Sequence, residues 1–484
     1  MSSTAKLSAK DRIYTLLDDN SFVEIGALVT KRSTDFNLQQ VETPGDGVVT
    51  GYGTIGDRPV YVYSQDAAAL NGTMGEMHAR KIVNLYRLAM KVGAPVVGLV
   101  DCAGLRLQEA TDALEAFGRI YKCQAMASGI IPQVTAIFGT CGGGMAVLAS
   151  MSDFVFMEEK NAKLFVNAPN AVLGNNVGKC DTASAKFMSE SGAVDFVMED
   201  EVSVLNGVRD LIYVLPSNNE DSNCEEDSAD DLNRSLPAFT EEITDPKAAL
   251  TDLSDEGIFV EVKADYAKEM VTGFIKLDGC TIGAVCNRSA IRDENGKTVS
   301  KFDSVLTTKG CYKAEKFVEF CDAFDIPVLT LTNVTGFSNE PSEVKGLAIA
   351  SAKLTAAFAN ATVPKINVVT GKAYGSAYIT MNSKSVGADL VYALTDAEIG
   401  TMDADLAAQI IYAKEIDEAE DKAAVKAQKA AEYKALCMNS LNAAKRGYVD
   451  SVIDGADLRA QLIYAFEMLM PKKELRPKKK HGTI

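Results

Sequence analysis

One pattern of residues occurs twice in this chain of 484 residues. The first copy reads GAPVVGLVDCAGLR (93–106) and then IPQVTAIFGTCGGGMA (131–146), and the second reads DIPVLTLTNVTGFS (325–338) and then VPKINVVTGKAYGSAY (363–378). The prolines of the two segments are 37 residues apart in both copies, and a single offset of 232 carries one copy onto the other. The duplication indicates two related halves rather than one enlarged domain.

Each copy follows the same order of predicted elements. A β-branched apolar run is typical of a buried strand, and it is followed by a glycine turn, a helix, a second buried strand and a second glycine turn. The predicted helices span 114–127 and 346–360, and strand-rich segments at 46–66 and 269–289 precede the two copies. Repeated units of strand, turn and helix predict a layered α/β fold.

An acidic segment at 216–235 separates the copies. It reads PSNNEDSNCEEDSADDLNRS and is poor in apolar residues, so we expect a linker that contributes nothing to a packed core. The predicted domains are therefore 1–235 and 236–484. An alanine-rich, charged run at 415–435 is predicted to be one surface helix with a wet face.

The composition excludes several classes of function. A formal net charge of −17 argues against nucleic acid or an anionic membrane as the main partner. No apolar run is long enough to cross a bilayer and the N-terminus lacks the apolar core of a signal peptide, which predicts a cytoplasmic protein. The ten cysteines show no metal-ligand spacing, so we expect no metal site and interpret most of them as small buried residues.

The second glycine turn of each copy is the candidate for chemistry. Residues 141–145 read CGGGM and residues 374–378 read YGSAY. A strand that ends in small residues before a helix exposes peptide N–H groups that nothing inside the helix accepts. Two such turns side by side would stabilise an oxygen that becomes negative, such as a thioester oxygen turning into an enolate. The alternative is that these glycines only permit close packing of helix on strand.

Other catalytic arrangements find little support in the sequence. No dinucleotide-binding glycine motif with its acidic partner occurs, and no P-loop. The two histidines are His78, on a predicted helix face, and His481, three residues from the end. A Ser-His-Asp triad is therefore hard to build, and we interpret His78 as a packing or hydrogen-bonding residue.

Nine motifs in order along the chain resemble the carboxyltransferase subunits of biotin-dependent enzymes, such as propionyl-CoA carboxylase β and the α subunits of methylmalonyl-CoA and glutaconyl-CoA decarboxylases. They are GDGVVTGYG (46–54), SQD (64–66), GEMHARKI (75–82), DCAGLRLQEA (101–110), ASGIIPQ (127–133), CGGG (141–144), FCDAFDIP (320–327), VPKINVVTGKAYGSAY (363–378) and AAKRGYVDSVID (443–454). The resemblance covers nearly the whole chain. It implies two tandem crotonase-like (ClpP/crotonase) domains, each a layered β-β-α superhelix, with acyl-CoA in the N-terminal domain and carboxybiotin in the C-terminal domain.

The resemblance also implies roles for backbone groups. In such enzymes the biotin ureido group takes the α-proton of the thioester and the enolate attacks CO2, so no histidine base is required. The residues expected at the thioester oxygen are Gly143, Gly144, Ala103 and Gly104. Those expected at the biotin oxygen are Ser376, Ala377, Gly336, Phe337 and Gly375.

Cofactor and partners follow from the same resemblance. Biotin is expected as carboxybiotin on a separate carrier protein, because the sequence AMKV at 89–92 lies in a helical pattern and not at an exposed hairpin tip. The substrate is expected to be an acyl-CoA such as acetyl-, propionyl- or methylmalonyl-CoA. Further partners are a biotin carboxylase or, if the chemistry runs in reverse, the membrane subunit of a sodium-translocating decarboxylase. A homo-hexamer is expected, with sites shared between the N-terminal half of one subunit and the C-terminal half of another.

Departures from the family pattern bear on specificity. Ile379 stands where the family has an acid, and it is expected to alter which acyl chain fits. The familiar MGAKGA stretch is MDADLA here, at 402–407, which affects the detail of the biotin pocket. Arg80, Lys81 and Arg106 are candidates to bind the CoA phosphates.

Two other functional classes stay open at this point. A crotonase-type hydratase or isomerase would act on CoA thioesters without biotin, and would need a carboxylate over the first-half turn. A scaffold that keeps the fold without catalysis is the other, because the stretch at 402–407 is altered.

Overall fold

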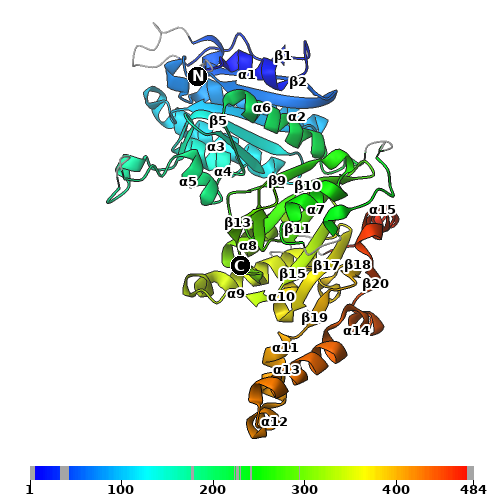
Figure 1. Cartoon of the computed structure of the whole chain (residues 1–484). Helices are drawn as coiled ribbons and strands as arrows, with labels where there is room; N and C mark the ends of the chain where they lie inside the picture. The colour runs from blue at the N-terminus through cyan, green and yellow to red at the C-terminus, as the bar shows by residue number, and fades with distance from the viewer. Residues whose placement is uncertain are drawn as a thin grey trace. The chain divides into compact units, whose positions relative to one another are not determined.

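The structure, a computed structural model, describes residues 6–32, 43–175, 179–222, 224, 228, 230–239, 243–293 and 295–476. Its contacts divide the chain into a first unit, Met1–Ser222, and a second unit, Asn223–Ile484. The division falls inside the acidic segment 216–235. Each unit is a mostly parallel sheet with helices packed on it (Figure 1).

The first unit is built on a sheet in the order β1-β2-β3-β4-β5-β6-β8, with β7 paired to β5. Its strands are β1 (Val23–Glu24), β2 (Val48–Ile55), β3 (Arg58–Gln65), β4 (Val96–Cys102), β5 (Gln133–Gly142), β6 (Phe154–Glu158), β7 (Lys163–Phe165) and β8 (Phe196–Met198). Its helices are α1 (Ala9–Leu16), α2 (Glu76–Val92), α3 (Ala110–Ala127), α4 (Gly144–Ser150), α5 (Ala185–Glu190) and α6 (Glu201–Val214). Side chains of α2, α3 and α4 share one apolar core with the sheet.

The second unit repeats this sheet in the order β9-β10-β11-β15-β17-β18-β20, with β19 paired to β17. Its strands are β9 (Phe259–Val262), β10 (Met270–Leu277), β11 (Cys280–Asn287), β15 (Val328–Val334), β17 (Lys365–Tyr374), β18 (Leu390–Leu394), β19 (Glu398–Gly400) and β20 (Ser451–Ile453). Two further pairs are β12 (Ala290–Arg292) with β13 (Thr298–Lys301), and β14 (Val305–Leu306) with β16 (Gly336–Phe337).

Along the chain, the second unit first has helices with counterparts in the first unit and then a group of C-terminal helices. They are α7 (Pro246–Leu253), α8 (Thr308–Ala323), α9 (Pro341–Asn360), α10 (Gly375–Thr380), α11 (Ala404–Ile411), α12 (Ala413–Glu418), α13 (Lys422–Tyr433), α14 (Ser440–Lys445) and α15 (Leu458–Leu469). Helices α7 and α15 share an apolar core with the sheet.

The sequence offset of 232 carries β4 onto β15 and β5 onto β17 at both ends. All seven residues of β4 and of β15 are buried, which confirms the predicted buried strands. The predicted helices are α3 and α9, each of which begins a few residues earlier than expected. For the hairpins β2–β3 and β10–β11 the offset is 222, and the ten additional residues of the second unit lie between β11 and α8, where β12 and β13 form.

The run at 415–435 is not one helix, so that prediction was wrong. Helix α12 ends at Glu418, Ala419 is extended, and Asp421 starts α13 by accepting a hydrogen bond from the N–H of Ala424. The aspartate cap therefore interrupts a pattern whose charges and alanines favour a continuous helix.

Part of the acidic segment packs against the second unit. Arg234 donates to the carbonyl of Ser254 (2.6 Å), Asp230 lies 3.4 Å from the buried guanidinium of Arg459, and Leu232 packs against the apolar core. The expectation that the whole segment stays outside the core was therefore wrong. The segment has few apolar residues, but the ion pairs of Asp230 hold it against the second unit, and Leu232 packs on the core. A disulfide joins Cys224 to Cys280 of β11.

Five of the other cysteines are buried, namely Cys102, Cys141, Cys286, Cys311 and Cys321. Within the described ranges, no helix has both the length and the apolar character that crossing a bilayer requires. No three histidine, cysteine, aspartate or glutamate side chains of the described residues gather as metal ligands would.

Candidate functional site

The structure brings the two predicted turns of the first unit together. Strand β4 pairs in parallel with β5, and Cys102 lies opposite Cys141 at the ends of the strands. A Cβ added to Gly104 would lie 3.5 Å from the carbonyl oxygen of Gly142. The turn after β4 and the turn after β5 are therefore neighbours, as parallel pairing requires.

Gly143 does not offer a free amide. Its N–H donates to the carbonyl of Phe165 at 2.9 Å, which continues the pairing of β5 with β7 by one residue. Its φ is 60°, and a Cβ at this position would meet only open space, so glycine is used there for its backbone conformation. The expectation that the Gly143 N–H serves an oxyanion is therefore wrong in this structure.

Gly144 differs from Gly143, and its predicted role at the thioester oxygen stays a prediction. It is the first residue of α4, and its N–H has no acceptor among the described residues. A Cβ on Gly144 would lie 2.9 Å from ring atoms of Phe117 and from the hydroxyl of Tyr121, which itself donates to the Gly144 carbonyl at 2.7 Å. Glycine is thus required here because α3 packs closely behind the turn.

The turn after β4 has its amides partly occupied. The N–H of Ala103 donates to the carbonyl of Asn71 at 3.3 Å. The N–H of Gly104 donates only to the sulfur of Cys102 at 3.4 Å, and sulfur is a weak acceptor. Burial raises the pKa of the Cys102 thiol to about 11, so the sulfur stays neutral. Of the four amides predicted to lie at the thioester oxygen, those of Gly144 and Gly104 remain for a ligand.

The corresponding turn of the second unit opens into a cavity of about 510 Å³. Five of its lining residues were predicted from the sequence: Gly336, Phe337, Gly375, Ser376 and Ala377. The structure therefore brings together every residue that the family pattern assigned to the biotin oxygen. Ser376 and Ala377 lie in the first turn of α10, where their N–H groups have no acceptor within the helix.

The altered stretch at 402–407 also reaches this cavity. Met402, Asp403 and Leu406 line it, and Asp403 caps α11 by accepting the N–H of Asp405 at 2.9 Å. The change from the family's glycine-rich sequence thus places an apolar side chain and an N-terminal helix cap beside the free amides.

Four lining residues were not predicted as site residues, namely Thr335, Lys372, Tyr374 and Thr401. Lys372 lies at the exposed end of β17, and Tyr374 precedes the glycine turn. The Tyr374 hydroxyl donates to Glu398 at 2.5 Å, and Glu398 pairs with Lys434 at 2.6 Å. Burial and the neighbouring Glu398 carboxylate raise the pKa of Tyr374, so its hydroxyl stays protonated.

Ile379 lies on α10, with 40% of its surface exposed, and it does not line this cavity. Its predicted influence on the acyl chain stays a prediction.

Two of the three cations expected to bind CoA phosphates are used inside the first unit. The Arg106 side chain is fully buried and lies 2.5 Å from Asp46 and 2.8 Å from Glu109. The ammonium of Lys81 donates to the carbonyls of Gly45 and Val48, and burial lowers its pKa to about 8. Neither group is available to a phosphate, so both predictions were wrong. Asp46 lies 60 positions from Arg106 and Gly45 lies 36 positions from Lys81, so sequence spacing could not reveal these partners.

Arg80 differs from them, because its side chain is exposed and, among the described residues, pairs only with Glu76, at 3.0 Å. His78 is buried, with Nε2 3.1 Å from the Gln65 amide and Nδ1 3.0 Å from the Asp46 carbonyl. Burial lowers the pKa of His78 to about 3, which confirms a neutral hydrogen-bonding role. His481 lies outside the described residues.

Comparison with known proteins agrees with this geometry. The carboxyl transferase domain model matches residues 2–484. The chain is 38% identical to methylmalonyl-CoA decarboxylase subunit alpha of Propionigenium modestum, over all of this chain and 94% of that one. It is 40% identical to a putative propionyl-CoA carboxylase beta chain of Bacillus subtilis, over 99% of this chain and 94% of that one.

A crystal structure of transcarboxylase 12S, described as a hexamer assembly with methylmalonyl-CoA and methylmalonic acid bound, matches with a TM-score of 0.91 and 35% identity. The match covers 99% of this chain and 92% of that one, and it confirms the expected fold class of two tandem crotonase-like α/β domains. The family depends on biotin and acts on acyl-CoA thioesters. This chain therefore belongs to the carboxyl transferase family, among the acyl-CoA carboxyltransferases that its motifs predicted.

Proposed function

We propose that this carboxyltransferase moves a carboxyl group between carboxybiotin, held on a separate carrier protein, and a short acyl-CoA such as acetyl-, propionyl- or methylmalonyl-CoA. Relatives that are 38–40% identical carry the names of propionyl-CoA and methylmalonyl-CoA enzymes, which supports a short acyl chain. The observation that carries the proposal is the cavity of about 510 Å³ beside the first turn of α10, where the amides of Ser376 and Ala377 have no acceptor within the helix.

The first unit is assigned to the acyl-CoA. The N–H of Gly144, supported by that of Gly104, donates to the thioester oxygen as it becomes an enolate oxygen. A donor aimed at developing charge in a site shielded from water typically lowers the barrier by about 3 kcal/mol.

The second unit is assigned to biotin. When biotin is bound, its ureido group supplies the carboxyl group and accepts the α-proton of the thioester. The amides of Ser376 and Ala377 donate to the ureido oxygen of biotin. Gly336, Phe337 and Gly375 line the same cavity. Neutral, buried His78 is consistent with a reaction in which no histidine takes the proton.

Partners and assembly form part of the proposal. A biotin carboxyl carrier protein delivers the cofactor, and either a biotin carboxylase or a membrane decarboxylase subunit completes the complex in the cytoplasm. A homo-hexamer is supported by the hexamer described for transcarboxylase 12S. Ile379 tunes the acyl chain from its exposed position on α10, and Arg80 binds a CoA phosphate.

The direction of the reaction has two candidates. Carboxylation of the acyl-CoA is the first, and decarboxylation as the α subunit of a sodium-translocating enzyme is the second. The relatives include both a carboxylase chain and a decarboxylase subunit, so both are retained.

The deciding experiment offers acetyl-, propionyl-, methylmalonyl- and glutaconyl-CoA to the purified chain with free biotin. We expect methylmalonyl-CoA to lose its carboxylate only when biotin is present, with carboxybiotin and propionyl-CoA formed in equal amounts. Crotonyl-CoA without biotin is the matched control. Hydration of crotonyl-CoA together with no biotin-dependent transfer would identify a hydratase, and no thioester binding at all by calorimetry would identify a scaffold.

A further inference from the structure

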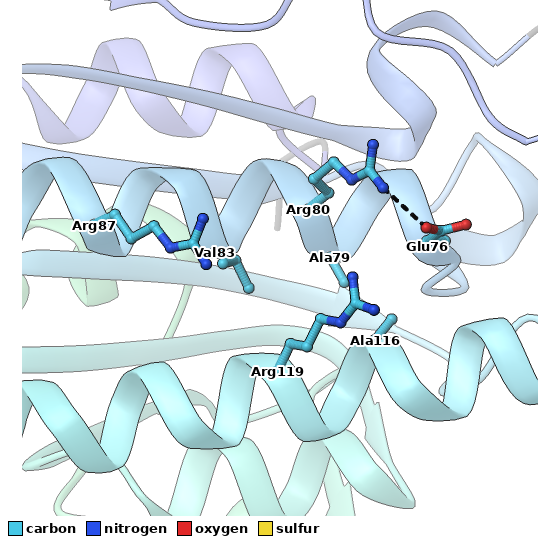
Figure 2. A pocket seen from close by; sticks show the side chains of 7 residues that line it. All are labelled: Glu76, Ala79, Arg80, Val83, Arg87, Ala116 and Arg119. Carbon is cyan, nitrogen blue, oxygen red and sulfur yellow. Dashed lines mark hydrogen bonds and ion pairs between the residues drawn. The ribbon is translucent and has the colours of Figure 1, made fainter.

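A small pocket lies in the groove between α2 and α3 of the first unit (Figure 2). Its volume is about 160 Å³, and it is lined by Glu76, Ala79, Arg80, Val83, Arg87, Ala116 and Arg119. Figure 2 shows the three arginine side chains rising from the two helices around the apolar floor of Ala79, Val83 and Ala116. Three guanidinium groups and one carboxylate give the lining a positive charge, although the chain as a whole carries −17.

The three arginines differ in how they are paired. Arg80 contacts Glu76 at 3.0 Å, and Arg119 contacts Glu115 at 3.4 Å, both across one helical turn. Arg87 has no hydrogen bond or carboxylate partner among the described residues. Glu76 is itself shared, because Arg32 lies 2.7 Å from its other oxygen. The pocket thus contains one unpaired guanidinium and two that are held by exposed ion pairs.

These exposed pairs are easily exchanged for a ligand. An exposed ion pair between residues four apart on a helix surface contributes little to stability. A charge-assisted, bidentate contact of guanidinium with a phosphate oxygen is stronger and geometrically matched. Arg80 and Arg119 would therefore turn from their glutamates toward a doubly charged anion bound at Arg87.

The size of the pocket limits the ligand. Since a cavity of about 150 Å³ holds a molecule the size of benzene, this volume suits a single phosphate group and not a whole nucleotide. A ligand carboxylate would have no hydrogen-bond donor on the side that faces the apolar floor of the pocket. A tetrahedral phosphate would present three oxygens to the three guanidinium groups.

We propose that the pocket formed by Arg80, Arg87 and Arg119 binds one phosphate monoester group, with Arg87 as its central contact. In part this rests on the proposed function, since the 3′-phosphate of CoA is one source of such a group and a separate phosphorylated ligand is the other. The pocket is connected to the candidate site through α3, because Ala116 and Arg119 flank Phe117, whose ring contacts Gly144.

Calorimetric titration of the full chain with inorganic phosphate tests the pocket without any turnover. We expect Arg87→Ala to weaken phosphate binding at least tenfold, and Glu76→Gln to strengthen it several-fold because a competing carboxylate is removed. Lys122→Ala is the matched control, an exposed cation on α3 outside the pocket, and it should leave the affinity unchanged. Equal phosphate affinity in the wild type and Arg87→Ala, or an equal loss in Lys122→Ala, overturns the proposal.

The source of the phosphate is separated by kinetics with propionyl-CoA and its 3′-dephospho form. If the pocket takes the substrate's own phosphate, Arg87→Ala raises KM for propionyl-CoA about tenfold, leaves kcat unchanged and leaves KM for the dephospho form unchanged. If it takes a separate ligand, both KM values stay at wild-type level while phosphate binding is still lost. The titration stands even if the chain shows no carboxyl transfer, so failure of the proposed function and failure of this pocket are distinguishable.

Discussion

The two units share a backbone, but different side chains lie behind their second glycine turns. In the first unit Phe117 and Tyr121 press against Gly144, and β7 takes the N–H of Gly143. At the matching positions of α9 the second unit has Ile349 and Lys353, and Ile349 is 51% exposed. The turn of the second unit opens into a cavity that is lined by residues of β16, β17, α10 and α11. The backbone sets where the amides lie, while the side chains around it decide which of them a ligand can reach.

The units also treat buried charge differently. The cluster of Arg106, Asp46 and Glu109 belongs to the first unit, and the offset of 232 places Ser338 and Pro341 where Arg106 and Glu109 stand. The second unit instead pairs Arg288 with Asp245 and Glu261. Duplication has thus preserved the strands while the ionic clusters were built separately.

Replacing the buried arginine should produce the largest effect. Arg106→Met leaves the carboxylates of Asp46 and Glu109 buried without their cation, which typically costs about 3–5 kcal/mol. Burial already raises the pKa of Asp46, and Arg106 opposes that rise, so the deficit should shrink as the pH falls and Asp46 takes up a proton. Urea unfolding at pH 5 and pH 8 measures the loss of stability and its dependence on pH. A variant of wild-type stability with a higher KM for acyl-CoA would instead restore Arg106 as a phosphate contact.

Removing one amide of the open turn should produce the next largest effect. Ser376→Pro deletes the N–H in the first turn of α10, where proline is tolerated and the N–H has no partner in the described chain. We expect kcat for carboxyl transfer to fall about 10²–10³-fold. Ser376→Ala keeps the N–H and serves as the matched control. Full turnover by the proline variant would exclude this amide from the reaction.

Adding one methyl group to the first turn and trimming the second compares their packing directly. Gly144→Ala should destabilise the first unit by about 1–3 kcal/mol, because the new Cβ overlaps Phe117 and Tyr121. Ser376→Ala should cost less than about 0.5 kcal/mol. Thermal unfolding of both variants measures the difference, and Phe117→Leu should partly rescue Gly144→Ala. Equal losses of stability in the two variants would show that α3 packs no more tightly behind its turn than α9 does.

The smallest expected effect concerns two equivalent aspartates. Asp153 accepts the N–H of Gln133 at 2.8 Å, as Asp389 accepts that of Lys365, but only Asp389 also pairs with a lysine, Lys472, at 2.9 Å. Burial raises the pKa of Asp153 to about 7. A raised folded-state pKa contributes stability that is present below about pH 4 and is lost as the pH rises to about 7.

Asp153→Asn should therefore be more stable than the wild type above pH 7, by about 1–2 kcal/mol, and equally stable near pH 4. Asp389→Asn should be slightly less stable than the wild type at neutral pH, because it gives up an ion pair worth up to about 1 kcal/mol. Unfolding curves from pH 4 to pH 8 measure whether each substitution raises or lowers the free energy of unfolding. The same sign for both substitutions would contradict the difference between the units.

The duplication and the buried strands could be predicted because they depend on local pattern and a fixed offset, whereas five residues of the second cavity were predicted from the resemblance to the carboxyltransferase family. Gly143 could not be resolved in this way, since its N–H is taken by Phe165, whose strand is brought alongside only by the folded sheet. Arg106 was misassigned for a similar reason, because Asp46 lies 60 positions away. Patterns near a turn identify which amides exist, and long-range pairing determines which remain free.

The attachment of residues 230–235 to the second unit has a practical consequence for separating the halves. A C-terminal fragment that begins at residue 236 would lack Asp230 and Leu232, and would leave Arg459 with Asp255 as its remaining acidic neighbour. A fragment that begins at residue 223 keeps all of these groups together with Cys224. Expression of the halves from two separate reading frames should therefore place the break after residue 222, so that the second polypeptide carries residues 223–235 at its N-terminus.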